Sequence, residues 1–155
     1  AIIIIFNKMQ IRNEYKINLI NKVEQILKRL EEQKIKMIIE KFKMRERKVI
    51  AHEMAHKTVG GRYTGPVHYI YTRGPDGKYY ITGGDVSIDV SEESNPEDTI
   101  RKMQIVRAAA LAPADPSPQD IRVAQIATIK EIKARIELAQ MKSSKNNKST
   151  FHVIV

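Results

Sequence analysis

The most constraining feature of the sequence is a long helix-forming run in its first half. The stretch "VEQILKRLEEQKIKMIIEKFKMRERKVIAHEMAH" contains no glycine or proline, and Gly60-Gly61 follows it after three further residues. Its apolar residues recur at steps of three, four and seven, with charged residues between them: Ile26, Leu27, Leu30, Ile35, Ile38, Phe42 and Val49. That period is typical of an amphipathic helix. The sequence predicts helix from about Tyr15 to Val59, either as one long arm or as two helices with a bend, ending at the two glycines.

The middle of the chain has the composition of a small sheet. "VHYIYT" and "KYYIT" are rich in β-branched and aromatic residues, and "RGPDG" between them is typical of a tight turn. "DVSIDV" then alternates, with Asp85, Ser87 and Asp89 on one face of the strand and the apolar residues on the other. We expect an antiparallel sheet of two or three strands.

Two further helices are predicted after the sheet. Asn95 can cap the first helix, with Pro96 at its first position, and Pro113 closes it. Ser117, Pro118 and Asp120 repeat this start signal for a helix that runs from about residue 118 to 141. The fold class is therefore α+β. The predicted organisation is a basic helical arm (1–46), a metallopeptidase domain (47–141) and a flexible polar tail (142–155).

Composition limits the chemistry and the partners. There is no cysteine, so a metal must be held by His, Asp or Glu. The apolar start "AIIIIF" is too short to span a membrane, and we expect a cytoplasmic protein. Residues 1–50 hold 13 basic and 6 acidic residues. Because these charges alternate and no nucleic-acid motif is present, the arm is predicted to serve helix packing or a protein partner, not sequence-specific nucleic-acid binding.

His52, Glu53 and His56 form an HExxH motif. On a helix, residues i and i+4 lie one turn apart on the same face, so two imidazoles can bind one ion. Zinc lowers the pKa of water toward about 7, and a neighbouring carboxylate can then accept its proton. The motif predicts His52 and His56 as zinc ligands and Glu53 as the catalytic acid and base. The alternative is an amphipathic helix that carries two partly exposed histidines.

A hydrolytic zinc site also needs a third protein ligand. The extended pattern HExxHxxGxxH is absent, because Val59 and Arg62 replace its glycine and third histidine. We favour Asp85, which follows Gly83-Gly84 at the start of a strand, then Asp89, then His68. Three glutamates cluster near the start of the next helix, where capping is the simpler explanation: Glu92, Glu93 and Glu97.

The region from about Arg47 to Ala127 resembles the SprA-related family of bacterial zinc metalloproteases. The resemblance rests on "VIAHEMAH", the following "GG", "YTRGPDG", "YYITGGDVSID" and "MQIVRAAALAPADPSPQD". It implies a zinc-dependent peptidase fold with His52 and His56 as ligands and Glu53 as acid and base. Family members usually carry glutamate at the position of Asp85, whose side chain reaches one methylene less far.

The leading functional hypothesis is a zinc metallopeptidase that hydrolyses a peptide or protein substrate. The alternative is a catalytically silent interaction protein, with a basic helical arm and a structural or vestigial metal site. The presence of Glu53 favours the first hypothesis, because its loss would remove the proton acceptor.

Overall fold

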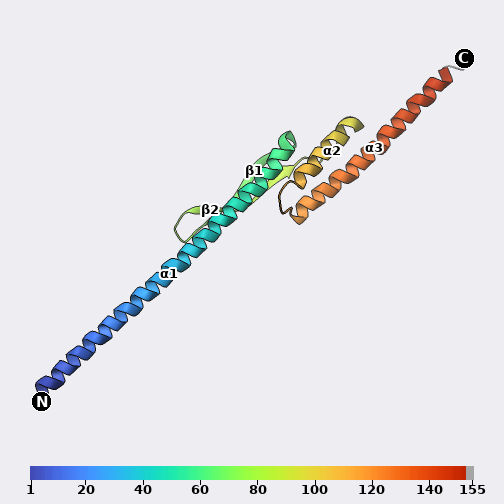
Figure 1. Cartoon of the computed structure of the whole chain (residues 1–155). Helices are drawn as coiled ribbons and strands as arrows, with labels where there is room; N and C mark the ends of the chain where they lie inside the picture. The colour runs from blue at the N-terminus through green and yellow to red at the C-terminus, as the bar shows by residue number, and fades with distance from the viewer. Residues whose placement is uncertain (153–155) are drawn as a thin grey trace. The chain divides into compact units, whose positions relative to one another are not determined.

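The structure is a computed structural model, which describes the backbone of residues 1–152 and the side chains of residues 1–149. Its elements, in order, are α1 (Ile2–Gly60), a 3-10 turn (Gly61–Tyr63), β1 (Thr64–Arg73), β2 (Tyr79–Ile88), α2 (Pro96–Ala110) and α3 (Pro118–His152) (Figure 1). The predicted α+β fold class is confirmed. No helix in the described part of the chain is long and apolar enough to cross a membrane.

Helix α1 is one continuous element of 59 residues, so the possibility of two helices is not realised. It begins at Ile2, earlier than the predicted start near Tyr15. The predicted end is confirmed, since the helix stops at Gly60 and Gly61 adopts a φ of +51°. Glycine suits this left-handed conformation because it has no Cβ to clash with the backbone.

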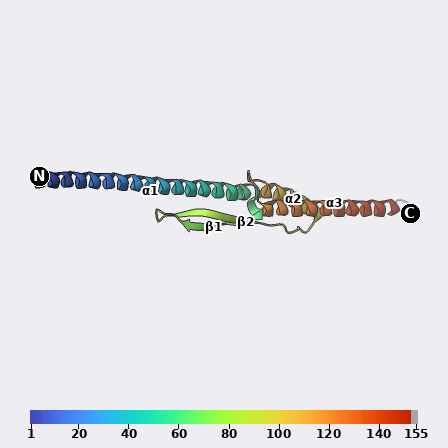
Figure 2. The ribbon, with the colours of Figure 1, turned by 90° about the horizontal axis from the view of Figure 1, so that it is seen from below.

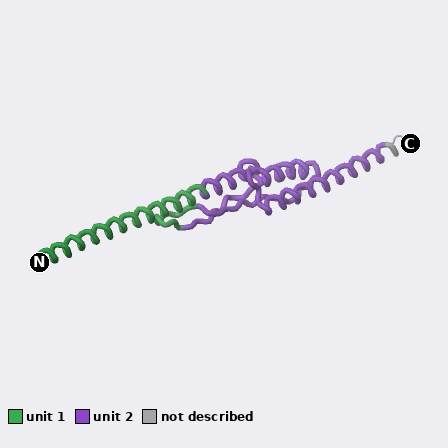
Figure 3. Tube along the Cα trace, turned by 60° about the horizontal axis from the view of Figure 1, so that its bottom comes forward, with its two compact units in different colours: residues 1–44, 73–80 green, residues 45–72, 81–155 purple. Residues whose placement is uncertain are grey.

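The chain divides into two compact units (Figure 3). The first contains residues 1–44 and the turn residues 73–80. Within it, the ring of Phe42 stacks on Tyr80 at a centroid distance of 5.4 Å. The second contains residues 45–72 and the chain from residue 81 onward, and it holds every residue of the HExxH motif.

The sheet consists of two strands, β1 and β2, joined by a tight turn. At this turn the amide of Gly74 donates to the carbonyl of Lys78 at 2.8 Å, and Gly77 has a φ of +78°. The predicted segments "KYYIT" and "DVSIDV" both contribute to β2, because the chain stays extended through Gly83-Gly84. In the second unit, the Nε atom of Arg45 donates to the Thr82 carbonyl at 2.7 Å, which ties β2 to α1 (Figure 2).

Both later helices begin at the predicted caps. The Asn95 side chain accepts from the amide of Asp98 at 2.8 Å, with Pro96 at the first helical position. Ser117 and Asp120 cap α3 reciprocally. The predicted end of this helix near Met141 is wrong, because α3 continues to His152. No glycine or proline interrupts the segment "KSSKNNKST", so helical hydrogen bonding can continue. The predicted tail's last residues, 153–155, lie outside the described part.

The core lies where α2 and α3 pack together and meet the end of the sheet. Met103 and Val106 of α2 and Ala127 of α3 are fully buried. Partly buried side chains surround them: Tyr63, Ile88, Val90 and Val123. The packing therefore holds the start of α3 and the end of β2 in one body with α2, and this determines which groups reach the HExxH motif.

Candidate metal centre

The two histidines of the motif converge on one point. His52 and His56 lie one turn apart on α1, and their Nε2 atoms are 3.2 Å from each other. Their rings meet edge to face, with centroids 4.9 Å apart and an interplanar angle of 80°. This convergence is the arrangement that the four-residue spacing predicts.

A carboxylate from α3 completes the group. The Oδ2 atom of Asp120 lies 3.2 Å from Nε2 of His52, and its Oδ1 atom lies 3.3 Å from Nε2 of His56. One ligand atom from each of the three residues lies within 4.8 Å of the other two. Asp120 is held in place by the helix start, because its Oδ2 atom also accepts from the amide of Ser117 at 2.8 Å. The three side chains form a group that could hold a metal ion.

The orientation of His56 is set by a contact with α2. Its side chain is buried, and its Nδ1 atom lies 2.9 Å from the carbonyl oxygen of Ala109. Because a carbonyl oxygen only accepts hydrogen bonds, Nδ1 donates in this contact, and Nε2 is the ring atom that faces His52 and Asp120. A backbone carbonyl behind a histidine is a common means of fixing a metal ligand.

Gly60 permits this contact. It lies one turn beyond His56, where α1 meets the end of α2. A Cβ at this position would overlap the side chain of Thr64 and lie 3.1 Å from the Cβ of Ala109. The missing side chain lets the end of α2 approach α1 closely enough for the Ala109 carbonyl to reach His56.

Glu53 lies beside the three converging groups and is buried. Burial raises the pKa of its carboxyl above the usual value, and the nearby His52 and His56 counteract part of that rise. No fully buried polar side-chain atom of the described residues lacks a partner. Since no protein group donates to the Glu53 carboxylate among those residues, its oxygens face solvent in the adjoining cavity.

The backbone of β2 passes close to Glu53 at Gly84. A Cβ at Gly84 would lie 3.0 Å from Cγ of Glu53 and 3.1 Å from the carbonyl oxygen of His68. Gly84 therefore leaves the space that the glutamate occupies. At Gly84 the strand therefore comes directly against the glutamate of the HExxH motif.

A cavity of about 420 Å³ opens in front of these groups. Its walls are the HExxH face of α1, residues 84–88 of β2 and the first turns of α3. The polar side chains Ser87, Ser117 and Gln119 line it together with the apolar Val123. The converging imidazoles, the Asp120 carboxylate and Glu53 are therefore accessible to a solute.

The structure places Asp120, not Asp85, beside the two imidazoles. Asp85 lines the cavity, but its Oδ2 atom lies 3.5 Å from Nδ1 of His68, and both side chains are well exposed. The carboxylate beside the imidazoles therefore comes from α3 and not from β2. In the sequence, Asp120 has the position of a helix-capping residue, and it ends the segment "MQIVRAAALAPADPSPQD". The place of Asp120 in this segment, on which the family resemblance rests, is the sequence signal that could have identified it as the third group.

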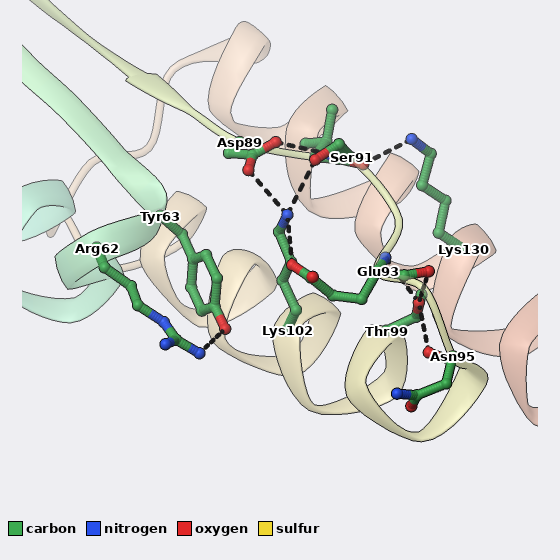
Figure 4. Close-up of polar contacts among 10 residues, drawn as sticks. Arg62, Tyr63, Asp89, Ser91, Glu93, Asn95, Thr99, Lys102 and Lys130 are labelled. Atoms are coloured by element: carbon green, nitrogen blue, oxygen red, sulfur yellow. Dashed lines mark hydrogen bonds and ion pairs between the residues drawn. The ribbon is translucent and has the colours of Figure 1, made fainter.

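The other candidate ligands have different partners. Asp89 and Glu93 accept from the buried Lys102, at 2.8 Å and 3.0 Å respectively (Figure 4). Hydrogen bonds from Lys102 and Ser91 hold the pKa of Asp89 far below its usual range. Glu92 pairs with Lys133 at 3.3 Å, and Glu97 lies in the first turn of α2. Among the described residues, the group of converging ligand atoms is therefore limited to His52, His56 and Asp120.

The donor set suits a divalent transition metal. Two imidazole nitrogens and one carboxylate oxygen are ligand types that zinc accepts in open sites. Because Nδ1 of His56 contacts the Ala109 carbonyl, Nε2 faces the other two groups, and Asp120 needs no rearrangement of its helix to face both rings. The residues present thus fit such an ion.

Fold and site together define a class: a small α+β chain with HExxH on a long helix and a facing carboxylate from a later helix. The chain belongs to the SprA-related family, whose model matches residues 7–150. The match extends well beyond the region from about Arg47 to Ala127 on which the resemblance rests. No curated protein and no solved structure matches the sequence.

Proposed function

We propose that this protein is a zinc-dependent metallopeptidase. The observation that carries the proposal is the convergence of His52, His56 and Asp120 within 4.8 Å, next to the buried Glu53. His52, His56 and Asp120 would hold the ion. A bound zinc supplies Lewis-acid chemistry, because it acidifies water and polarises a carbonyl group.

Glu53 performs the proton transfers in this proposal. Its carboxylate accepts a proton from a water molecule in the cavity and donates it to the amine that leaves when the peptide bond breaks. Burial favours this role, since it raises the pKa of the carboxyl and makes the carboxylate a stronger base. Gly84 keeps the neighbouring strand from displacing the side chain.

The cavity provides the binding site for the substrate. Residues 84–88 of β2 form one wall, and the first turns of α3 form another. The mixture of backbone, hydroxyl and apolar groups along these walls suits a peptide segment, which presents amide groups and side chains in alternation. The Asp85 carboxylate at the rim favours substrates with a basic side chain nearby.

Metal content and hydrolysis together test the proposal. The purified chain is expected to retain about one zinc ion through dialysis, measured by inductively coupled plasma mass spectrometry. Loss of zinc is expected in the variant His52→Ala with His56→Ala. The zinc-loaded chain is then incubated with a mixed library of unstructured peptides, and cleavage is followed by mass spectrometry.

Glu53→Gln is the matched control, because glutamine has the same size but cannot accept the proton. It should retain zinc and abolish cleavage. Full zinc binding by the double histidine variant contradicts the metal site. If the chain binds one zinc ion but cleaves no peptide of the library, the proposed peptidase activity is contradicted. That result supports an interaction protein with a structural metal site.

A further inference from the structure

The first compact unit carries an exposed apolar stripe along α1. Six side chains between residues 19 and 30 are each 47–59% exposed: Leu19, Ile20, Val23, Ile26, Leu27 and Leu30. Their spacings of three and four place them on one face of the helix. Every residue of α1 up to Met37 is exposed, so no described part of the chain covers this stripe.

The stripe follows a repeat of seven residues. Val23, Leu30 and Met37 are seven apart, and Leu19 and Ile26 form a second series four positions before Val23 and Leu30. Ile2, Ile5 and Met9 continue the same two series toward the N-terminus. Two alternating apolar series with a seven-residue repeat form the seam of a coiled coil. Three seam positions are polar, Arg12, Lys16 and Gln33. Polar residues at seam positions lower the stability of a coiled coil and fix the alignment between its helices.

The two edges of the stripe carry opposite charges. Lys22, Arg29 and Lys36 lie seven residues apart along one edge, whereas Glu24 and Glu31 lie seven apart beyond the other, which also carries Lys34. This separation of positive and negative charges distinguishes a lipid surface from a helical partner. An anionic lipid surface attracts the basic edge but repels the glutamates along the other. A partner helix that also has one basic and one acidic edge can form favourable ion pairs with both edges of the stripe.

We propose that this stripe, residues 16–37 of α1, binds the same stripe of a second copy of the chain in parallel orientation. When two such helices pair in parallel, the basic edge of each lies beside the acidic edge of the other. In antiparallel pairing, like edges meet, and Lys22, Arg29 and Lys36 face the same residues of the partner. The charge pattern is thus self-complementary in the parallel arrangement, and pairing removes the apolar stripe from water.

The association state of the full chain tests the pairing. Light scattering during size-exclusion chromatography is expected to give twice the 17.8 kDa of one chain at micromolar concentration. Val23→Glu with Leu30→Glu should reduce the mass to that of one chain. Asn21→Glu with Gln25→Glu adds the same charge on the opposite face of the helix and should leave the pair intact. A single-chain mass for the unmodified protein, or equal effects of the two variants, overturns the proposal.

Charge reversal tests the role of the edges. Lys22→Glu with Arg29→Glu makes both edges acidic and should weaken association. Adding Glu24→Lys and Glu31→Lys to this variant restores opposite edges and should restore association. These residues lie far along α1 from the HExxH motif, so zinc binding serves as a folding control and should stay unchanged. No recovery in the fourfold variant contradicts the charge argument.

Orientation is measured directly with a spin label. The chain has no cysteine, so Gln10→Cys introduces one attachment site outside the stripe. Helices that pack side by side have axes about 10 Å apart, so parallel pairing gives a short distance between the two labels. In an antiparallel pair centred on Val23, the labels would be separated by roughly 40 Å along the helix, at about 1.5 Å per residue. The longer distance overturns the parallel arrangement.

Discussion

The Nδ1 atom of His56 lies 2.9 Å from the backbone carbonyl oxygen of Ala109, at the C-terminal end of α2. This contact links the HExxH helix to the helix that packs against α3. The Ala109 carbonyl also accepts from the amide of Ala112 at 3.3 Å, and a carbonyl oxygen has two lone pairs, so it can accept from His56 as well. The second histidine of the motif is therefore oriented by tertiary packing as well as by its own helix.

Asp120 is expected to contribute more to zinc affinity than Asp85. Asp120→Asn keeps an oxygen that can accept from the amide of Ser117, so the helix start should survive while the ligand charge is lost. We expect zinc affinity to fall by more than about 100-fold, the upper range for removing only a supporting group behind a ligand. Competition with a chromogenic chelator measures this change.

Asp85→Asn is the control for this prediction. It removes the same charge from the cavity rim without touching the group of converging ligand atoms. Zinc affinity in this variant should stay within about threefold of the parent, since the rim charge is well exposed and screened. A larger loss in Asp85→Asn than in Asp120→Asn would assign the third ligand to the strand.

Gly60→Ala is predicted to destabilise the second unit and to weaken zinc binding. The added methyl group overlaps the Thr64 side chain and crowds Ala109, so α2 must move away from His56. Overpacking of this kind costs about 1–3 kcal/mol of unfolding free energy. Chemical denaturation followed by circular dichroism measures the loss.

A second substitution distinguishes this steric cause from a change in helix propensity. Thr64→Ser removes the methyl group that the new Cβ would overlap, while its hydroxyl can still donate to the Gly61 carbonyl. The double variant should regain part of the lost stability. Absence of any recovery would indicate that the overlap with Thr64 is not the cause.

The buried Lys102 is predicted to depend strongly on its carboxylate partners. Its side chain is only 2% exposed, whereas those of Asp89 and Glu93 are 51% and 40% exposed. Removing both negative charges, with Asp89→Asn and Glu93→Gln, leaves a buried ammonium without a counter-charge. Such a change costs about 3–5 kcal/mol of unfolding free energy.

Lys102→Met should be milder, because the two half-exposed carboxylates can be hydrated again and methionine fills a similar volume. Urea denaturation of both variants gives the comparison. The prediction is contradicted when Lys102→Met costs more stability than the double carboxylate variant.

Stability at acid pH is predicted to depend on Glu131. Burial alone would raise the pKa of this carboxyl, but hydrogen bonds from Arg135, Arg107 and Gln104 outweigh it and hold the pKa below the usual 4.5. A lowered folded-state pKa means that the contribution to stability is complete above about pH 4.5. It is then lost as the pH falls through the folded-state pKa.

Unfolding free energies of the parent and of Glu131→Gln, measured from pH 7 to pH 3, test this dependence. The difference between the two should shrink as the pH falls below 4.5. Glu137→Gln, an exposed position on the same helix, should show no such change. A difference that stays constant across the range would exclude Glu131 as the source.

Several features of this protein follow from local sequence alone. The four-residue spacing of His52 and His56 places both imidazoles on one helical face, because the helix repeats every 3.6 residues. Asn95 and Ser117 cap their helices through bonds to residues three positions later. Gly60-Gly61 ends α1 for the equally local reason that Gly61 adopts a positive φ. Each of these features depends on neighbours in the chain, so each could be predicted.

The identity of the third converging group depended on tertiary structure. Asp85 and Asp120 both follow local signals, a strand after two glycines and a helix cap, and neither signal shows which one faces the imidazoles. That choice depends on the packing of α2 against α3 and on the contact between Gly60 and Ala109, which brings the start of α3 to the HExxH helix. Contacts between distant segments arise from the shape of the packed core, and no spacing in the sequence encodes them.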